Sequence, residues 1–597
     1  IFYRAASLPH TAKYTYEDGT LAPGQNRSIG NPVYHLNNDK RKNSKDNLSL
    51  SLAAYWEFLP GFRFTPQLSM YKYTTDGYSF IPSYWNGSMT FNDSREAKGY
   101  YTKTLQGQMD LVLGYNKLFA DAHNVDVKAG FSYFGREKST LNATGEGAAT
   151  DLIPTLNASA SAKSVKGDES TQAIAGFFAR VNYDYKDRYL ISLSARFDGA
   201  SNLGDDHKWG FFPGVSVGWN VHNEAFFKGQ EWINYLKLRF SIGNPGNQNF
   251  DAYISMNVYG YSTAYPNPFG LSAVISTWGN NNLEWQKTID QNYGIDMAFL
   301  KNRLKVTVDY FIKNTDPLLV YVQMPSSTGA STAPMNLGKQ VTEGVTAVLN
   351  YTILQKEYMN WNFNLNARHI TSEYKNIGNS LDKYNQDNRS SNLTRYYDGG
   401  SPSDLWAVRS AGIDPATGRE IFIKKDGTQT FVHDYADEVV VGNSDPKVEG
   451  VIGTSFYYKG FTASINLRYR LGGQIFLSTL YDKVENISDN ALKYNQDKRA
   501  LYDRWQKPGD VSKFKAISLT ETTPMSSRFV ADENTLSGES ISLGYETQAK
   551  WLKYIGASSM TIRGYMNDIF RISTVKNERG LDYPFARTVA FSLGVRF

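Results

Sequence analysis

Cysteine is absent from the 597 residues of this chain. Its absence excludes disulfide scaffolds, thiolate metal sites and a cysteine nucleophile, although it does not fix a cellular compartment. Long hydrophobic runs are also missing, since no stretch of about 18 consecutive apolar residues occurs and mean hydropathy is −0.46. These features exclude a protein that crosses a membrane with helices. An excess of one charge is missing as well, because 63 basic residues face 58 acidic ones, and this near-neutrality indicates no nucleic-acid partner.

The usual signals of a chain start are missing too. The sequence begins Ile1-Phe-Tyr-Arg-Ala5, with no Met, no basic segment and no apolar segment followed by small residues, so we expect no signal peptide within these residues. We therefore expect either that the mature protein starts here or that an upstream part is missing. The strand count below favours the second alternative.

Aromatic residues, in contrast, are abundant. The chain holds 41 Tyr, 33 Phe and 11 Trp, which is 14% of the sequence and excludes a disordered chain, where such residues are depleted. The length would suggest about four soluble domains, yet no linker or shift in composition separates them. A large all-β protein remains, either a soluble protein or a membrane β-barrel.

Strict alternation of apolar and polar residues marks the strands. In 588–597 the apolar positions are every second residue, and the same period of two recurs in 177–185, 188–198, 302–313 and 460–471. A soluble sandwich also alternates, but its strands usually have about 5–6 residues. These segments run to roughly ten or more, the length that a tilted strand needs to cross a bilayer. Their polar faces are rich in Arg, Asp, Lys and Asn, which favours a wet lumen and predicts a transmembrane antiparallel β-barrel.

Seventeen strands of this kind can be counted. Short turns such as Pro60-Gly61 and Lys459-Gly460 alternate with long loops such as 370–446, so we expect the short turns on the periplasmic side and the long loops outside. The predicted strands lie near 47–58, 62–73, 100–115, 123–134, 173–186, 188–199, 210–221, 232–243, 286–299, 302–313, 343–354, 358–369, 447–458, 460–471, 538–549, 557–567 and 586–597.

The parity of this count yields a further expectation. The first and the last predicted strand both run towards the periplasm, whereas a closed barrel with an even number of strands and periplasmic ends begins with a strand running outward. We therefore expect residues 1–597 to be the C-terminal part of one barrel, with an odd number of strands and a plug domain absent. Five missing strands would give 22, the number found in plugged outer-membrane transporters.

Several short motifs, each weak alone, occur in a characteristic order. Through them the chain resembles the SusC/RagA-type TonB-dependent outer-membrane transporters over essentially its whole length, and most densely over 240–597. Thr342 and Thr346 depart from the family pattern, which usually has Asn and Glu there. The matching motifs are Gly243-Asn-Pro-Gly-Asn-Gln248, Leu283-Glu-Trp285, Tyr293-Gly-Ile-Asp296, Asn302-Arg303-Leu304, Glu343-Gly-Val345, Gly412-Ile-Asp-Pro415, Thr417-Gly418 and the final Phe597.

This resemblance implies a function and partners. Family members import oligosaccharides or, in some cases, peptides across the outer membrane with a SusD-like surface lipoprotein that closes over the barrel as a lid. TonB acts through an N-terminal plug and box, and the barrel itself sits in outer-membrane lipid. The family has no catalytic residues and the resemblance implies no cofactor. We therefore expect TonB-dependent import of oligosaccharides, with import of oligopeptides, a passive porin and a surface adhesin or scaffold as alternatives.

Aromatic residues of the long loops are the candidates for ligand binding, because a ring offers a flat apolar face to sugar C–H groups and its polar edge can bond hydroxyls. Packing against the lid protein or within the loops is the alternative role for each of them. The candidates are Tyr259, Tyr261, Trp278, Tyr396, Tyr397, Trp406 and Trp505.

A second set of candidates is basic and is expected to face the lumen. These arginines either attract acidic ligands or pair with acidic residues such as Asp184 and Asp198 and with a plug, and the sequence favours pairing. They are Arg180, Arg196, Arg239, Arg468 and Arg470.

Catalytic and metal motifs are unconvincing. Gly214-Val-Ser-Val-Gly218 matches the nucleophile elbow of hydrolases, but it lies inside a predicted strand rather than at a turn from strand to helix. The seven His residues show no spacing typical of zinc sites. The acidic residues 198, 205 and 206 lack the ligand spacing of an EF-hand. We therefore expect no enzyme and no metal site.

Overall fold

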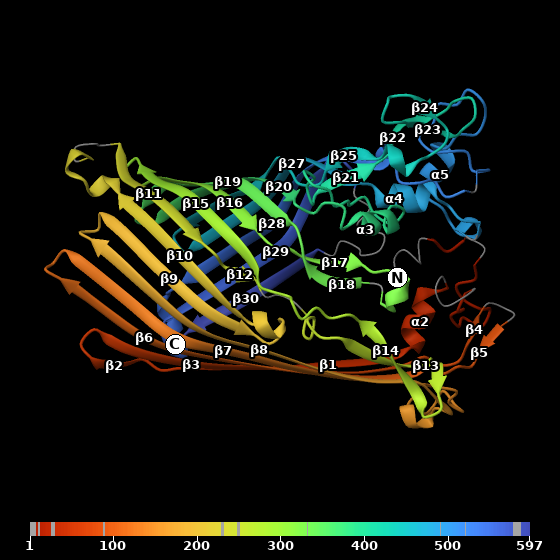
Figure 1. The fold of residues 1–597 in the computed structure, drawn as a ribbon, viewed down its shortest axis with the longest axis horizontal. Coiled ribbons are helices and arrows are strands. Elements are labelled where there is room, and N and C mark those ends of the chain that lie inside the picture. The colour runs from red at the N-terminus through yellow and green to blue at the C-terminus, as the bar shows by residue number, and fades with distance from the viewer. Residues whose placement is uncertain are drawn as a thin grey trace.

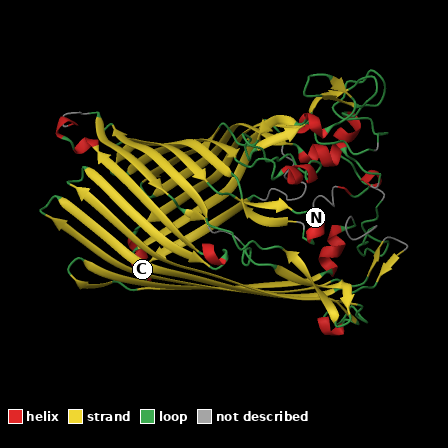
Figure 2. Cartoon of the chain, in the orientation of Figure 1, coloured by secondary structure: helices red, strands yellow, loops and turns green. Residues whose placement is uncertain are grey.

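The computed structural model describes residues 7–9, 12–24, 30–86, 90–227, 232–247, 251–330, 332–489, 491–519, 521–576 and 587–597. One large antiparallel sheet curves into a barrel wall, and loops, short hairpins and short helices gather at one end of it (Figures 1 and 2). Among the described residues, no helix is both long enough and apolar enough to span a membrane.

Within the described residues, the sheet contains nineteen strand segments. β2 continues β1 along the same edge of β3, and β12 continues β11 along β15. The nineteen segments therefore form seventeen strands, as predicted. The segments are β1 (Lys40–Ala53), β2 (Trp56–Leu59), β3 (Phe62–Phe80), β6 (Ala97–Phe119), β7 (His123–Glu146), β8 (Ser161–Tyr185), β9 (Tyr189–Ala200), β10 (Trp209–Asn220), β11 (Ile233–Gly243), β12 (Gly246–Asn247), β15 (Gln286–Phe299), β16 (Leu304–Thr315), β19 (Lys339–Lys356), β20 (Met359–Lys375), β26 (Val448–Tyr458), β27 (Phe461–Phe476), β28 (Val530–Thr547), β29 (Ser559–Ser573) and β30 (Thr588–Arg596).

Neighbours in sequence are neighbours in the sheet, and every pair is antiparallel, so this is an up-and-down meander. Short turns join the strands at one end, and their backbone needs left-handed residues. At two of them glycine is required: Gly61 has φ +83° and Gly460 has φ +92°, and a Cβ there would come 2.7 Å from the Asn116 carbonyl oxygen and 2.3 Å from that of Glu546, respectively. These tight turns hold each hairpin in register.

The two edge strands of the described sheet run in the same direction, because seventeen is odd. β1 pairs with β3 and β30 pairs with β29, and no ladder joins β1 to β30 within the described residues. The described residues before β1 include α2 (Pro32–Asn38), which lies at the loop end of the sheet (Figure 1). There the carbonyl of Ser7 accepts a hydrogen bond from the Asn495 N–H at 3.0 Å.

The outer face of the wall is apolar from the first strand to the last. Register places Leu50 beside Met70, and at the opposite edge Ile562 lies beside Leu593. Many of these side chains are exposed, and Leu52 (72%) and Phe591 (80%) are examples. A continuous exposed band of this kind fits the hydrocarbon core of a bilayer, and aromatic residues at the short-turn end, such as Trp56, occupy the position of an interfacial girdle.

Five strands extend well beyond this band. β3, β6, β7 and β8 have 19, 23, 24 and 25 residues, whereas β9 has 12, and the long strands project together with β1 towards the loop end (Figure 1). Because the predicted strands ended at 73 and 134 and the next began at 100 and 173, the sequence predicted loops over 74–99 and 135–172. Strands of the wall occupy 74–80, 97–99, 135–146 and 161–172, so the prediction was wrong for these parts. Outside the bilayer both faces of a strand meet water, so the apolar alternation that marks a strand disappears there.

Short elements build the outer loops. The helices there are α3 (Asp382–Asp387), α4 (Ser478–Leu480) and α5 (Arg499–Tyr502). The small sheets pair β4 (Tyr84–Asn86) with β5 (Thr90–Asn92), β13 (Val258–Asn267) with β14 (Gly270–Thr277), β17 (Leu319–Gln323) with β18 (Thr332–Asn336), and β21 (Asp404–Ala407) with β25 (Val439–Asn443). A further small sheet combines β22 (Arg409–Ile413), β23 (Glu420–Ile423) and β24 (Gln429–Thr430).

Candidate functional site

The inner face of the wall is lined by charged residues that register brings together from neighbouring strands. Arg239 on β11 lies between Asp296 on β15 and Asp309 on β16, and its nitrogens approach both carboxylates to 2.8 Å. The Thr307 hydroxyl donates a further hydrogen bond to Asp296. Arg239 therefore acts as a cross-link over three strands, with both acidic partners in place.

Three more of the predicted lumen arginines also have acidic partners. Arg196 forms a bidentate pair with Asp198 at 2.9 Å, and Arg468 lies 3.0 Å from Glu539. Arg470 approaches Glu449 at 3.5 Å. These contacts agree with the preference for pairing that the sequence suggested, although Asp184 accepts instead from the Asp187 N–H.

Arg180 differs from the other four. Its Nε donates to Asn182 and Ser192, both neutral, at 3.0 and 3.2 Å, and no carboxylate lies within ion-pair distance of it among the described residues. Arg180 borders a hollow of about 770 Å³ on the inner wall, whose other charged lining residues are Asp290, Lys313 and Arg368. Lys313 pairs with Asp290 at 3.4 Å and Arg368 pairs with Glu449 at 2.7 Å. Arg180 is therefore the cation of this hollow that would attract an anionic group.

The outer loops over 376–446 and 477–529 are joined by a buried charge network. Arg528 donates to Glu420 at 2.8 Å and to Glu485 at 2.7 Å, and the Glu485 side chain is fully buried. Glu485 also accepts from the Thr523 hydroxyl at 3.0 Å. Ser526 completes the set by donating to Glu420 at 2.6 Å. We call Glu420, Glu485 and Arg528 the loop clasp, because they join two loops that are separated by two strands.

Burial and charge act against each other in the clasp. Burial lowers the pKa of Arg528, but hydrogen bonds and charge from Glu420 and Glu485 outweigh it, so the pKa lies above its ordinary value. Nearby Lys515 shows the opposite balance, since burial lowers its pKa more than Glu485 raises it. Arg528 therefore stays charged, and the clasp depends on its ion pairs.

A second buried ion pair stabilises the loop over 376–446. Arg395 is 1% exposed and donates to both carboxylate oxygens of Glu438, at 2.7 and 3.1 Å. Its remaining N–H groups bond backbone carbonyls at Asn392 and Thr394. Because its N–H groups all have hydrogen-bond acceptors, the planar guanidinium fixes the geometry of the loop around it. Partners 43 and 108 residues apart give no local signal, so these buried ion pairs were not predicted from the sequence.

Five of the seven predicted aromatic residues pack within the loops. The Nε1 of Trp278 donates to the Thr328 carbonyl, and that of Trp505 donates to the Pro415 carbonyl. Tyr396 contacts Tyr374 and Tyr384, and Tyr397 lies against Trp406 with ring centroids 5.1 Å apart. These contacts give each ring a structural role, and ligand contact remains a prediction for them.

The other two candidates point into solvent. Tyr259 and Tyr261 lie on the same face of the β13–β14 hairpin and are 59% and 82% exposed. The hairpin is attached near β8 through Tyr253, whose hydroxyl contacts the backbone N–H and the hydroxyl of Thr171 at 3.0 Å each. Two exposed rings on an extracellular hairpin are available to a ligand or to a partner protein.

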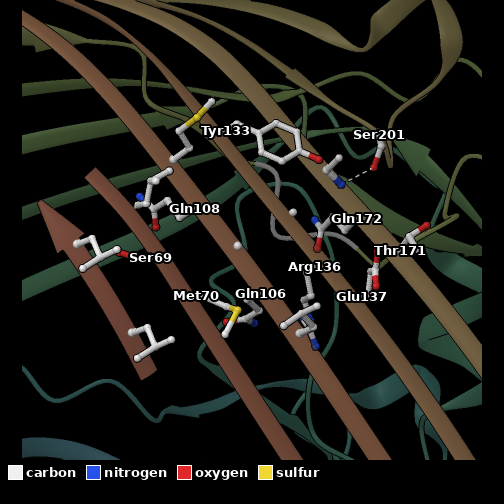
Figure 3. Close-up of a pocket in the computed structure, with 18 residues that line it drawn as sticks. Ser69, Met70, Gln106, Gln108, Tyr133, Arg136, Glu137, Thr171, Gln172 and Ser201 are labelled. Carbon is white, nitrogen blue, oxygen red and sulfur yellow. Dashed lines mark hydrogen bonds between the residues drawn. The ribbon is translucent and has the colours of Figure 1, made fainter. Parts of the chain in front are cut away.

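A further pocket lies across β1, β3, β6, β7 and β8 (Figure 3). It has about 680 Å³, and most of its side chains belong to the outer, apolar face, among them Leu50, Met70 and Tyr133. The hollow arises where Gly107 faces Gly135 across the β6–β7 ladder, because neither residue fills the space with a side chain. Its position on the outer face separates it from the lumen, so we assign it no role in cargo passage.

Clusters that suit metal binding are missing from the described part of the chain. No group of three or more His, Asp or Glu side chains has a geometry that could hold a metal ion there. Gly214 to Gly218, which match the hydrolase motif, lie within β10. The candidate functional features are the charged inner wall and the cluster of outer loops.

Comparison with known proteins identifies the architecture. The model of the family described as "TonB dependent receptor-like, beta-barrel" matches residues 2–487. The chain is 28% identical to TonB-dependent receptor P39 of Formosa agariphila over 82% of its length and 53% of that protein. It is 26% identical to TonB-dependent receptor SusC of Bacteroides thetaiotaomicron over 87% of its length and 51% of that protein.

Solved structures agree on the fold. A structure of the RagAB peptide transporter superposes with a TM-score of 0.82 at 19% identity, and the match covers 94% of this chain and 62% of that one. The chain spans about half the length of the curated relatives that it matches.

Proposed function

We propose, because this chain belongs to the TonB-dependent receptor β-barrel family and is of its SusC/RagA type, that it imports oligosaccharides by TonB-dependent transport. The family resides in the outer membrane and is not a class of enzymes, and both statements hold for this chain. The observation that carries the proposal is the seventeen-strand wall, apolar outside and ion-paired inside, with an elaborate loop cluster at one end.

In this proposal residues 1–597 form the C-terminal part of the barrel, and a plug and a TonB-contacting segment belong to the same transporter. A SusD-like lipoprotein closes over the loop end, where the exposed Tyr259 and Tyr261 offer rings to sugar or to the lid. Paired groups such as Arg239 with its two aspartates give the lumen a hydrated wall past which a polar solute can move. Outer-membrane lipid surrounds the apolar band.

Peptide import is the second candidate, since a structural relative is described as a peptide transporter. Uptake of labelled oligosaccharides and of labelled oligopeptides by cells that carry the transporter decides between the two. We expect oligosaccharide uptake that disappears when TonB is deleted. Uptake that persists without TonB would indicate a passive porin, and growth unchanged on every nutrient after gene deletion would indicate an adhesin or scaffold.

A further inference from the structure

The five strands that project beyond the apolar band have two solvent-facing surfaces of very different charge. Residues that are partners in an antiparallel ladder point to the same side of a sheet, so the register assigns each charged residue to a face. The outer face of this extension balances its charges, with Lys40, Lys42, Lys72 and Lys103 against Asp46, Asp76, Glu137 and Glu169.

The inner face of the extension is strongly basic. Six cations lie on it and two acids, which gives a net charge of +4. The cations are Arg41, Lys45, Lys98, Arg136, Lys138 and Lys166, and the acids are Asp168 and Glu146, of which Glu146 lies 3.4 Å from Lys163 at the end of the sheet. We call these eight residues the basic face. The two faces share the same strands and the same solvent, so the fold and solubility do not demand this asymmetry.

Most of these cations have no internal partner. Arg41 approaches Asp39 at 3.1 Å. The other five, which are all exposed, form no ion pair with another described residue. Lower on the same inner face the pattern reverses, since Arg196 and Arg239 are bound to aspartates. Uncompensated positive charge is therefore concentrated outside the bilayer and towards the mouth of the barrel.

The residues between the cations are hydrogen-bonding groups. The rows that hold Lys45, Lys138 and Lys166 also hold polar groups and two tyrosines on the same face, namely Asn47, Thr102, Thr140, Asn142, Ser170, Tyr73 and Tyr100. The centre of a protein–protein interface is normally depleted of charge, and this face is rich in cations. A hydrated arrangement of cations, amides, hydroxyls and two tyrosine rings suits a ligand that carries both negative charge and many hydroxyl groups.

We propose that the basic face binds an acidic oligosaccharide, one that carries sulfate or carboxylate groups along its chain. This proposal deepens the proposed import function and rests on it. Same-face residues repeat every ~7 Å along a strand, and strands lie ~5 Å apart, so several anionic groups of one oligosaccharide are contacted at once. Below the basic face on the same side of β8 lies Arg180, which has no acidic partner among the described residues and borders the hollow on the inner wall. This hollow gives the anion a next position inside the barrel.

The test uses the purified full-length transporter with its lid lipoprotein, and four probes: a heparin hexasaccharide, an oligogalacturonate hexamer, maltohexaose and hexaglutamate. Binding is measured by titration calorimetry at 50 and 300 mM NaCl. The inner-face variant carries Arg136→Gln, Lys138→Gln and Lys166→Gln. The matched control carries Lys40→Gln, Lys72→Gln and Lys103→Gln on the outer face of the same strands.

We expect a sulfated or carboxylated hexasaccharide to bind more tightly than maltohexaose, and more weakly at 300 mM salt. The inner-face variant should lose about tenfold or more in affinity, on the order of two- to fivefold per cation, while the control stays within twofold. Maltohexaose binding as tightly as the acidic sugars, preferential binding of hexaglutamate, or equal effects of the two variants would overturn the proposal. The proposal would also be overturned if the inner-face variant bound acidic sugars with unchanged affinity but no longer bound the lid lipoprotein.

The import function is measured separately, as TonB-dependent uptake in cells. Binding of acidic sugars by the basic face without uptake would contradict the import function and leave this assignment standing. Uptake of a neutral sugar with no acidic-sugar binding would contradict the assignment and leave the import function standing.

Discussion

The substitution Glu485→Gln tests whether the loop clasp holds the extracellular cluster together. Glu485 is fully buried and receives Arg528 at 2.7 Å and the Thr523 hydroxyl at 3.0 Å. The amide keeps the shape of the side chain but removes its charge, so Arg528 is left with one of its two carboxylates. Breaking a buried ion pair by removing one partner costs about 3–5 kcal/mol. We take the lower part of that range, because Glu420 still compensates Arg528.

Hydrogen exchange of the protein in detergent, detected by mass spectrometry, measures the loss of local stability in each segment of the chain. A change of about 3 kcal/mol corresponds to roughly a hundredfold loss of protection, and we expect it in peptides covering 478–529 while the barrel strands stay protected. The matched control is Lys383→Gln, which removes an exposed pair with Asp387 at 2.6 Å. Such a pair contributes about 0.3–0.5 kcal/mol, so protection should change less than threefold. Equal, small effects in the two variants would refute the view that the clasp is an energetic link.

Three further outcomes are expected. Arg239→Met should lower the thermal midpoint of the full-length protein in detergent by about 2–4 °C, whereas Arg180→Met should change it little. The reason is that Arg239, unlike Arg180, compensates two aspartates. Equal shifts of the two variants would contradict this explanation. Burial lowers the pKa of His433, so the stabilising contribution of its neutral form is fully present above pH ~6.5 and is lost as the pH falls further. Hydrogen exchange in 420–438, corrected for the intrinsic pH dependence of the exchange rate, should therefore rise between pH 7 and 5. The substitution His433→Gln should flatten that rise. The double substitution of Tyr259 and Tyr261 by Ala should weaken oligosaccharide binding about threefold to tenfold in calorimetry without altering the thermal midpoint, and unchanged affinity would remove both from the binding site.

The sequence predicted the part of the wall that lies in the membrane because lipid and water impose opposite demands on alternate residues. Val589, Phe591 and Leu593 alternate with small or polar residues, and β30 is found there. The number of strands followed from the same pattern. Strand ends in water were placed less well, since β8 begins at Ser161, twelve residues before the predicted strand.

The candidate sites were predictable only as residue types. Aromatic residues in long loops were identified, but sequence alone could not separate Tyr261, which is exposed, from Tyr396, which packs against two other tyrosines. That separation depends on contacts between loops far apart in the chain. The clasp shows the same limit, because Glu420 and Arg528 are brought together only when the loops fold over the barrel.

Outside the bilayer, the distribution of charge distinguishes the two faces of a strand, whereas the hydropathy pattern does not. Within β1, the segment Lys40 to Asp46 has no apolar alternation and looks like a charged loop, yet its positions divide between two faces as regularly as those of a buried strand. Lys45 and Lys138 are 93 residues apart in sequence, and only the register through β3 and β6 places them on one surface. A balanced outer face and a basic inner face arise from the same strands. The difference therefore reflects what each face meets, and only the inner face continues into the lumen.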